Sequence, residues 1–120
     1  MWEVEITDQF VEWWDGLTIS QRERVTATVD ALEEHGPNLK RPLVGAVKAS
    51  KIANLKELVI SGRDYELRVL FVFDPRRVAI LLLGGDKTGQ WKEWYPQAVA
   101  DAERLYDEHL DELRKEGLIK

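Results

Sequence analysis

Arg68 is the residue of this sequence with the clearest chemical consequence, because it interrupts the apolar run at residues 67–73. A guanidinium in an apolar strand must reach water along its aliphatic stem, pair with a carboxylate, or face an open concave surface. Side chains alternate between the two faces of a strand, so Arg68 points away from the main apolar face of its own strand. We expect it on an open face of a sheet, and a salt bridge to Glu57 or Glu66 is the alternative.

Two lysines are candidates to act together with Arg68. Lys56 lies on the preceding predicted strand beside Glu57, and these two side chains point to opposite faces. Lys87 follows the predicted central strand and its flexible glycines, a position from which a cation can reach a ligand. The three cations, Arg68, Lys56 and Lys87, are therefore candidates to bind an anionic ligand.

Six further residues fit the binding of an RNA chain, in which cations contact phosphates and aromatic rings stack on bases. They are Lys48, Lys51, Arg76, Arg77, Trp91 and Tyr95. Each group also has a structural interpretation. The two arginines lie in a predicted tight turn, where solvated side chains are common. The two aromatic residues are suited to anchoring the last predicted helix on the core.

Charge is distributed unevenly along the chain, although a formal net charge of −5 argues at first sight against a nucleic-acid binder. Residues 1–36 sum to −7, residues 37–96 to +5 and residues 97–120 to −3. The stretch 37–54 carries four bases and no acid. A cationic segment between acidic flanks is compatible with a polyanion-binding surface. A solvated sheet edge that lysines protect from aggregation is the alternative.

Composition excludes several classes of protein. The 120 residues, 44% hydrophobic and 32% charged, predict one soluble globular domain over 1–120. The absence of cysteine excludes disulfides, thiolate metal sites and a cysteine nucleophile, and two histidines leave little for zinc or a catalytic triad. No apolar run approaches the roughly 20 residues of a membrane span, and the acidic amino terminus lacks the apolar stretch of a secretory signal. We expect a cytoplasmic protein with no metal, cofactor or membrane partner.

The predicted elements follow the order strand, helix, helix, three strands and helix. Residues 2–6 alternate apolar and acidic, as a half-buried strand does. The first helix carries the apolar stripe Phe10, Trp14 and Leu17, and the second begins at a capping box from Ser20 to Glu23. A loop over 37–54 is followed by strands at 55–60, 65–73 and 78–83. Gly84-Gly85 ends the last of these strands, and the final helix covers 95–116.

This order predicts an α+β fold. A small, mainly antiparallel sheet contains an amino-terminal strand, the helical hairpin packs on one face, and a helix ends the chain. The second face of the sheet is only partly accounted for by these elements. We expect the functional site on that second face.

From residue 55 onward, several segments resemble the HigB/RelE toxin superfamily, and within it the phage-derived Gp49-like group. The segments are Lys56-Glu57-Leu58, residues 67–71, Arg76-Arg77 and residues 80–87. The strand at Trp2 and the helix with Trp13-Trp14 are also similar to that group, so the resemblance spans nearly the whole chain.

The resemblance implies a toxin of a type II toxin–antitoxin pair with a sheet like that of microbial RNases. Many such toxins cleave mRNA at the ribosome without a metal. A cognate antitoxin, often with a helix-turn-helix domain, holds them inactive. Arg68 matches the arginine that the family carries on this strand, and Lys87 matches its cationic position after the central strand. RNA can be cut through its own 2′-hydroxyl if cations stabilise the pentavalent phosphate and nearby groups accept and donate protons. The resemblance therefore leads us to predict Arg68, Lys56 and Lys87 as catalytic residues, with Arg68 as the bidentate phosphate clamp.

Two other functions remain open on the same scaffold, because fold does not determine function. One is a toxin like ParE, which poisons DNA gyrase and cuts nothing; the other is a non-catalytic interaction module. The ribonuclease interpretation depends on Arg68 standing free on the open side of the sheet. If Arg68 instead lies beneath the final helix, paired with a carboxylate and shut off from solvent, the ribonuclease interpretation fails and only the scaffold remains.

Overall fold

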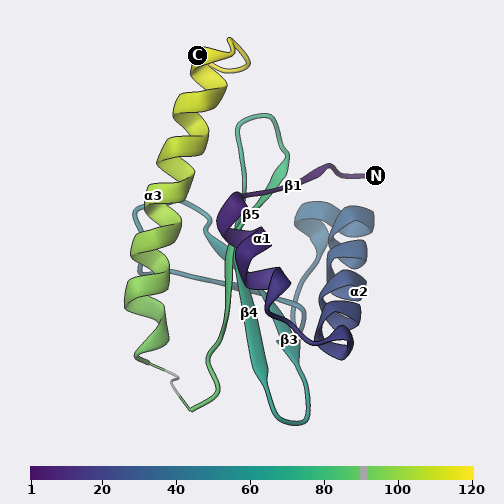
Figure 1. The fold of residues 1–120 in the computed structure, drawn as a ribbon. Coiled ribbons are helices and arrows are strands. Elements are labelled where there is room, and N and C mark those ends of the chain that lie inside the picture. Colours follow the sequence, from purple (N-terminus) through teal and green to yellow (C-terminus); the bar gives the residue numbers. More distant parts are fainter. Residues whose placement is uncertain (90–91) are drawn as a thin grey trace.

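The computed structural model describes residues 1–89 and 92–120. Five strands form one sheet in the order β1-β5-β4-β3-β2, with helices on both sides of it (Figure 1). Among the described residues, no helix is long and apolar enough to cross a bilayer. The elements are β1 (Val4–Ile6), α1 (Asp8–Asp15), α2 (Ile19–His35), a short 3-10 helix η1 (Gly36–Asn38), β2 (Val44–Ala46), β3 (Lys56–Ser61), β4 (Glu66–Phe73), β5 (Ala79–Asp86) and α3 (Trp94–Lys115).

The sheet has the predicted α+β arrangement. The β2–β3, β3–β4 and β4–β5 pairs are antiparallel, and β1 alone joins in parallel, beside β5. Parallel strands need a long crossover connection. The helices α1 and α2 follow β1 in the sequence and provide this connection to the rest of the sheet. The predicted fold class is confirmed.

The helical hairpin covers one face of the sheet, as predicted. Phe10 of α1 and Val25 and Leu32 of α2 share one buried cluster with Leu58 and Val69 of the sheet. Burying each of these large side chains contributes roughly 1.5–3 kcal/mol to folding. The hairpin is therefore a structural layer that fixes one face and leaves chemistry to other parts of the molecule.

The long helix α3 covers the opposite face, which the sequence left partly open. Ala98, Val99 and Ala102 pack against Leu70 and Ile80 in a second buried cluster. Small residues on the buried stripe let the helix approach the sheet closely, so α3 packs over β4 and β5 on the side opposite the helical hairpin (Figure 1). The expectation of an uncovered second face is wrong.

Helix α2 begins two residues earlier than predicted. The capping box is made by Thr18 and Gln21: the Thr18 hydroxyl accepts from the Gln21 N–H at 3.1 Å, and the Gln21 side chain accepts from the Thr18 N–H at 2.9 Å. Ser20 and Glu23, the predicted pair, lie inside the helix. Two overlapping cap patterns occur in the sequence, and the tight turn from α1 selects the earlier one.

Two strands also differ from their predicted limits. β2 lies inside the predicted loop 37–54, because its three residues find a partner in β3 although they are too few to show a period. β5 continues through Gly84 and Gly85 to Asp86. The missing Cβ atoms make room for the Trp13 ring on one face and the Trp94 ring on the other, so these glycines extend the strand instead of ending it.

Candidate active site beneath the final helix

Arg68 lies on the face of β4 that α3 covers, and only 6% of it is exposed. Its Nη1 donates to Glu66 Oε2 at 2.9 Å and to the Leu67 carbonyl at 3.0 Å. Its Nε lies 3.4 Å from Glu57 Oε1. This Nε is buried and makes no hydrogen bond with any described residue. The guanidinium is therefore held by two carboxylates, and its contact with Glu57 is an ion pair that lacks the geometry of a hydrogen bond.

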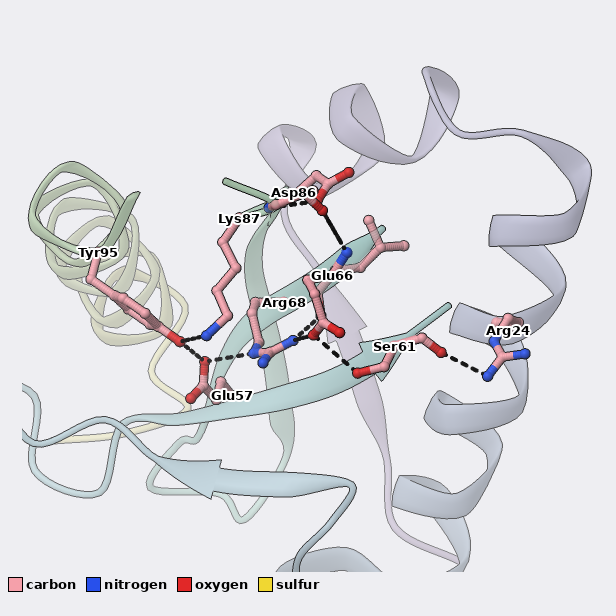
Figure 2. A network of polar contacts seen from close by, with 10 residues as sticks. Arg24, Glu57, Ser61, Glu66, Arg68, Asp86, Lys87 and Tyr95 are labelled. Atoms are coloured by element: carbon pink, nitrogen blue, oxygen red, sulfur yellow. Dashed lines mark hydrogen bonds and ion pairs between the residues drawn. The ribbon is translucent and has the colours of Figure 1, made fainter. Parts of the chain in front are cut away.

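Glu57, Tyr95 and Lys87 form a chain of hydrogen bonds beside this guanidinium (Figure 2). The Tyr95 hydroxyl, at the start of α3, donates to Glu57 Oε1 on β3 at 2.7 Å. Lys87 Nζ, just after β5, donates to the Tyr95 hydroxyl at 3.2 Å. A carboxylate, a guanidinium, an amine and a phenol from four different elements thus meet in one place, which we call the Arg68 cluster.

The charges of the Arg68 cluster balance one another. Arg68 and Lys87 oppose Glu57 and Glu66, so the four ionised groups sum to zero. Burial lowers the pKa of Lys87, and the Arg68 charge lowers it further against the opposing effect of the two carboxylates. Burial, with help from Glu57, raises the pKa of Tyr95 to about 12. At neutral pH the phenol is therefore a proton donor, and the amine loses its proton more readily than an ordinary lysine.

The first turn of α3 closes the Arg68 cluster. The Trp94 ring occupies the space above Gly85, and Tyr95 lies against the cluster itself. The expected open guanidinium is therefore wrong, and the alternative salt bridge is confirmed with both Glu57 and Glu66. A buried guanidinium without partners would be costly, so the strand face supplies two carboxylates. Arg68 is therefore buried beneath the final helix and paired with carboxylates, which is the arrangement that the sequence analysis gave as contradicting the ribonuclease interpretation. A nuclease reaction at Arg68 requires a rearrangement that uncovers the guanidinium.

Lys56 does not join this cluster. It pairs in register with Phe71 and lies 5.6 Å from the centre of the Phe73 ring, on the side of the sheet that carries the helical hairpin. Arg68 and Glu57 lie on the other side. The sequence pattern placed Lys56 and Glu57 on opposite faces of their strand. The consequence that Lys56 is then also on the opposite face from Arg68 was not drawn. Arg68 and Lys87 come together, and Lys56 faces away from both.

Lys56 instead lines a hollow at the β2 edge of the sheet, which we call the cationic groove. Its volume is about 620 Å³, and it adjoins a smaller hollow of about 280 Å³ that shares Pro37 and Lys56. Within the described part of the chain, the five bases lining the two hollows have no ion pair with a carboxylate. These bases are Lys40, Arg41, Lys48, Lys56 and Arg77.

The remaining predicted RNA-binding residues take different positions. Arg76 is tied to Asp74 at 2.8 Å and to Glu5 at 3.0 Å, so it links the β4–β5 turn to β1. Lys51 is exposed, and its backbone N–H donates to Glu103 at 2.7 Å. Tyr95 belongs to the Arg68 cluster, and Trp91 lies outside the described residues.

Glu57 is the site residue that sequence reasoning missed as a reactive group, since it entered only as a salt-bridge partner. A usable signal existed: β3 and β4 pair antiparallel, and alternation places Glu57 and Arg68 on the same face of adjacent strands. Among the described residues, no group of three or more His, Cys, Asp or Glu side chains could hold a metal ion.

The arrangement of sheet and helices is that of RelE-type toxins. The archaeal RelE of the RelE–RelB complex from Pyrococcus horikoshii OT3 superposes with a TM-score of 0.57 at 20% identity, covering 72% of this chain and 94% of that one. A mutant of the E. coli toxin RelE in the free state gives a TM-score of 0.54 at 12% identity, over 75% of this chain and 87% of that one.

Sequence comparison gives a closer relationship. The family model "Phage derived protein Gp49-like (DUF891)" matches residues 12–107. "Putative toxin HigB3" of Mycobacterium tuberculosis is 44% identical over 107 residues, which are 89% of this chain and 92% of that protein. "Putative toxin HigB2" of the same organism is 40% identical over 111 residues, but the chain spans only 54% of its length. The chain belongs to the Gp49-like family of the HigB/RelE toxin superfamily.

Proposed function

We propose that this chain is a toxin of a toxin–antitoxin pair that cleaves mRNA without a metal, and that the Arg68 cluster is its reaction site. The observation that carries the proposal is the buried Arg68 Nε, which forms an ion pair with Glu57 at 3.4 Å but makes no hydrogen bond with any described residue. An amine and a phenol lie beside the same carboxylate. A buried donor without a hydrogen bond is rare in folded proteins and is often explained by function. A phosphate oxygen is an acceptor that suits it.

The chemistry of the proposed step needs only these side chains. The Glu57 carboxylate takes the proton of the RNA 2′-hydroxyl, and the 2′-oxygen attacks the adjacent phosphorus. The bond from phosphorus to the 5′-oxygen breaks, which leaves a 2′,3′-cyclic phosphate on one fragment. The leaving 5′-oxygen takes a proton from Lys87, whose lowered pKa makes its ammonium a better acid. Arg68 stabilises the negative charge on the pentavalent phosphate.

The proposal requires movement of the start of α3. In the closed arrangement the cluster is neutral and Arg68 is 6% exposed, so a phosphate has neither access nor net attraction. Displacing Trp94 and Tyr95 would uncover Arg68 and release Glu57 from the hydrogen bond with the Tyr95 hydroxyl. We therefore propose a toxin whose reaction site is closed in the free protein and opens on its target.

The cationic groove is the surface that we propose for holding the RNA backbone. The five bases of the groove and the adjoining hollow come from four segments, around η1, β2, the start of β3 and the β4–β5 turn. Phosphate contacts by such bases supply most of the affinity for nucleic acid. Lys56 of the groove is the neighbour of Glu57 of the cluster on β3, and only the short strand β2 separates β3 from the sheet edge. An RNA chain that passes over this edge can reach both faces.

The partners that we propose are ribosome-bound mRNA in the cytoplasm and a cognate antitoxin, which in this superfamily often carries a helix-turn-helix domain. Support for an antitoxin comes from the P. horikoshii relative, which was crystallised as a RelE–RelB complex. The cationic groove and the closed cluster are two surfaces on which an antitoxin could act.

The test is growth arrest on expression of three variants. Glu57→Gln and Arg68→Lys keep the size of the cluster, and each should abolish arrest if proton transfer and the guanidinium fork are required. Arg63→Lys is the matched control, because Arg63 lies exposed in the β3–β4 turn and should keep full toxicity. Circular dichroism and thermal melting confirm that each variant is folded.

A second candidate function has its own supporting observation. The neutral, closed state of the Arg68 cluster is what a toxin without nuclease activity would also present, including one that binds DNA gyrase. If folded Glu57→Gln and Arg68→Lys both arrest growth like the parent chain, the ribonuclease proposal fails and the binding toxin replaces it.

A further inference from the structure

An apolar hollow lies between the helical hairpin and the free edge of the sheet, on elements that the proposed reaction does not use. Its volume is about 220 Å³, and nearly all of its lining is apolar. A cavity of about 150 Å³ in another protein admits benzene, so this hollow has room for one large apolar side chain. We call it the β1 groove; it is lined by Val4, Ile6, Phe10, Val11, Trp14, Val25, Thr26, Val29 and Leu81.

The β1 groove borders an unpaired strand edge. β1 is the outermost strand, and no other strand of the described residues pairs with its outer side. Glu3 and Thr7 direct their backbone groups to β5, where the Glu3 carbonyl accepts from Ala79 and the Thr7 N–H donates to Leu81. By the alternation of a strand, the backbone groups of Val4 and Ile6 face outward. An extended chain could add there as a further strand.

Two large apolar side chains, one on β1 and one on α1, are exposed to solvent beside this edge. Ile6 is 52% exposed and Val11 is 38% exposed, although both line the β1 groove. Natural sheets usually protect such an edge with charge, proline or a covering loop. An apolar groove beside an open strand edge combines a pocket for side chains with hydrogen-bonding groups for a backbone.

The surroundings of the β1 groove decide the charge of its occupant. Its lining residues, apart from Leu81 of β5, lie within residues 1–36, which carry a net charge of −7. A neighbouring hollow shares Ile6 with the groove and supplies the acidic rim, because it is lined by Glu5, Asp8, Glu12, Glu108 and Glu112. Of the two bases of this segment, Arg24 donates to the Ser61 carbonyl, away from the groove. Arg22 donates to the backbone carbonyls of Trp14 and Asp15 and lies 5.5 Å from the centre of the Trp14 ring, so it is the one base beside the groove among the residues of this segment. A second copy of this chain would bring the same acidic surface against itself.

We propose that the β1 groove binds an extended segment of a partner protein in which apolar residues alternate with lysine or arginine. The segment adds a strand to the outer edge of β1, one of its apolar side chains enters the groove, and its bases face the acidic rim. This interaction does not depend on the proposed nuclease reaction, because the groove and the Arg68 cluster use different residues on different elements.

The experiment measures binding of a short synthetic peptide in which lysine alternates with valine and isoleucine. A peptide with glutamate in place of each lysine is the charge control. Backbone amide shifts in NMR spectra locate the contact, and fluorescence anisotropy of the labelled peptide gives the affinity. We expect the basic peptide to shift the Val4 and Ile6 amides and to bind at least about tenfold more tightly than the acidic one.

Variants of the full chain test the groove itself. Val11→Lys and Thr26→Lys place a charge in the groove at exposed positions, and each should weaken binding by about tenfold or more. Ile19→Lys is the matched control, because Ile19 is 76% exposed and lies outside the groove; it should leave the affinity within about twofold.

Four results would overturn the proposal. The first is equal affinity for the basic and the acidic peptide, and the second is an equal loss of peptide affinity in Ile19→Lys and in the groove variants. The third is a set of amide shifts confined to the cationic groove. The fourth is a dimer of this chain in sedimentation that Val11→Lys abolishes, which would make a second copy the occupant. Since Glu57→Gln leaves the β1 groove unchanged, this variant should bind the peptide as the parent chain does. Failure of the nuclease proposal and failure of this one are thereby distinguished.

Discussion

Replacing Tyr95 with phenylalanine tests whether α3 is held down by the Arg68 cluster. The substitution removes one oxygen that donates to Glu57 at 2.7 Å and accepts from Lys87 at 3.2 Å. Lys87 is 6% exposed and the Glu57 side chain 14% exposed, so water replaces little of either contact. A hydrogen bond to a charged group contributes about 1.5–3 kcal/mol, and we expect Tyr95→Phe to lower the free energy of unfolding by about 2–3 kcal/mol.

The assay is urea unfolding at neutral pH, followed by tryptophan fluorescence, with Tyr106→Phe as the matched control. Tyr106 is a half-buried tyrosine of the same helix, and the described residues offer no hydrogen bond to its hydroxyl. Its substitution should therefore change the free energy of unfolding by less than about 0.5 kcal/mol. Equal destabilisation by the two substitutions would refute the hydrogen-bonded chain from Glu57 through Tyr95 to Lys87.

Two further predictions concern the stability of the fold. Burial opposes ionisation of Asp74, but hydrogen bonds from His109, Arg76 and backbone N–H groups win and lower its pKa below 3.8 in the folded chain. The carboxylate therefore stabilises the fold above its unfolded pKa, and this contribution is lost as pH falls below about 3.8 through the folded value. Asp74→Asn should cost about 3 kcal/mol at pH 7 and flatten the acid dependence in urea unfolding; an unchanged acid limb contradicts this assignment. Gly85→Ala places a methyl group against the Trp94 ring and should cost about 1–3 kcal/mol in thermal melts, whereas Gly16→Ala, whose added carbon lies 3.6 Å from its nearest neighbour, should be nearly neutral.

Most of the fold could be predicted from the sequence, because strong periodic patterns carry it. The helix stripe at Phe10 and Trp14 and the apolar strand at residues 67–73 each appear as predicted, within one or two residues. What escaped prediction depends on contacts between distant segments. The three residues of β2 become a strand only beside β3, and Gly84-Gly85 continue β5 only because rings from α1 and α3 fill the space above them.

The site was predicted only in part for the same reason. Alternation correctly placed Arg68 away from the main apolar face and separated Lys56 from Glu57. Whether that second face is open depends on where α3 packs on the sheet. The sequence pattern of α3, with Ala98 and Ala102 on its apolar stripe, did not indicate how closely the helix approaches the sheet. Charge counting likewise found a cationic middle segment but could not show that its bases divide between the paired Arg68 cluster and the cationic groove.

The chemical form of the cut RNA ends tests the central claim most directly. A reporter mRNA is translated on ribosomes with the purified chain, and the new 3′ ends are identified by mass spectrometry. An Arg68 cluster that activates the 2′-hydroxyl through Glu57 predicts 2′,3′-cyclic phosphate ends with the parent chain and none with folded Glu57→Gln. Ends carrying a free 3′-hydroxyl, or cyclic phosphate ends in equal amount from Glu57→Gln, would contradict it.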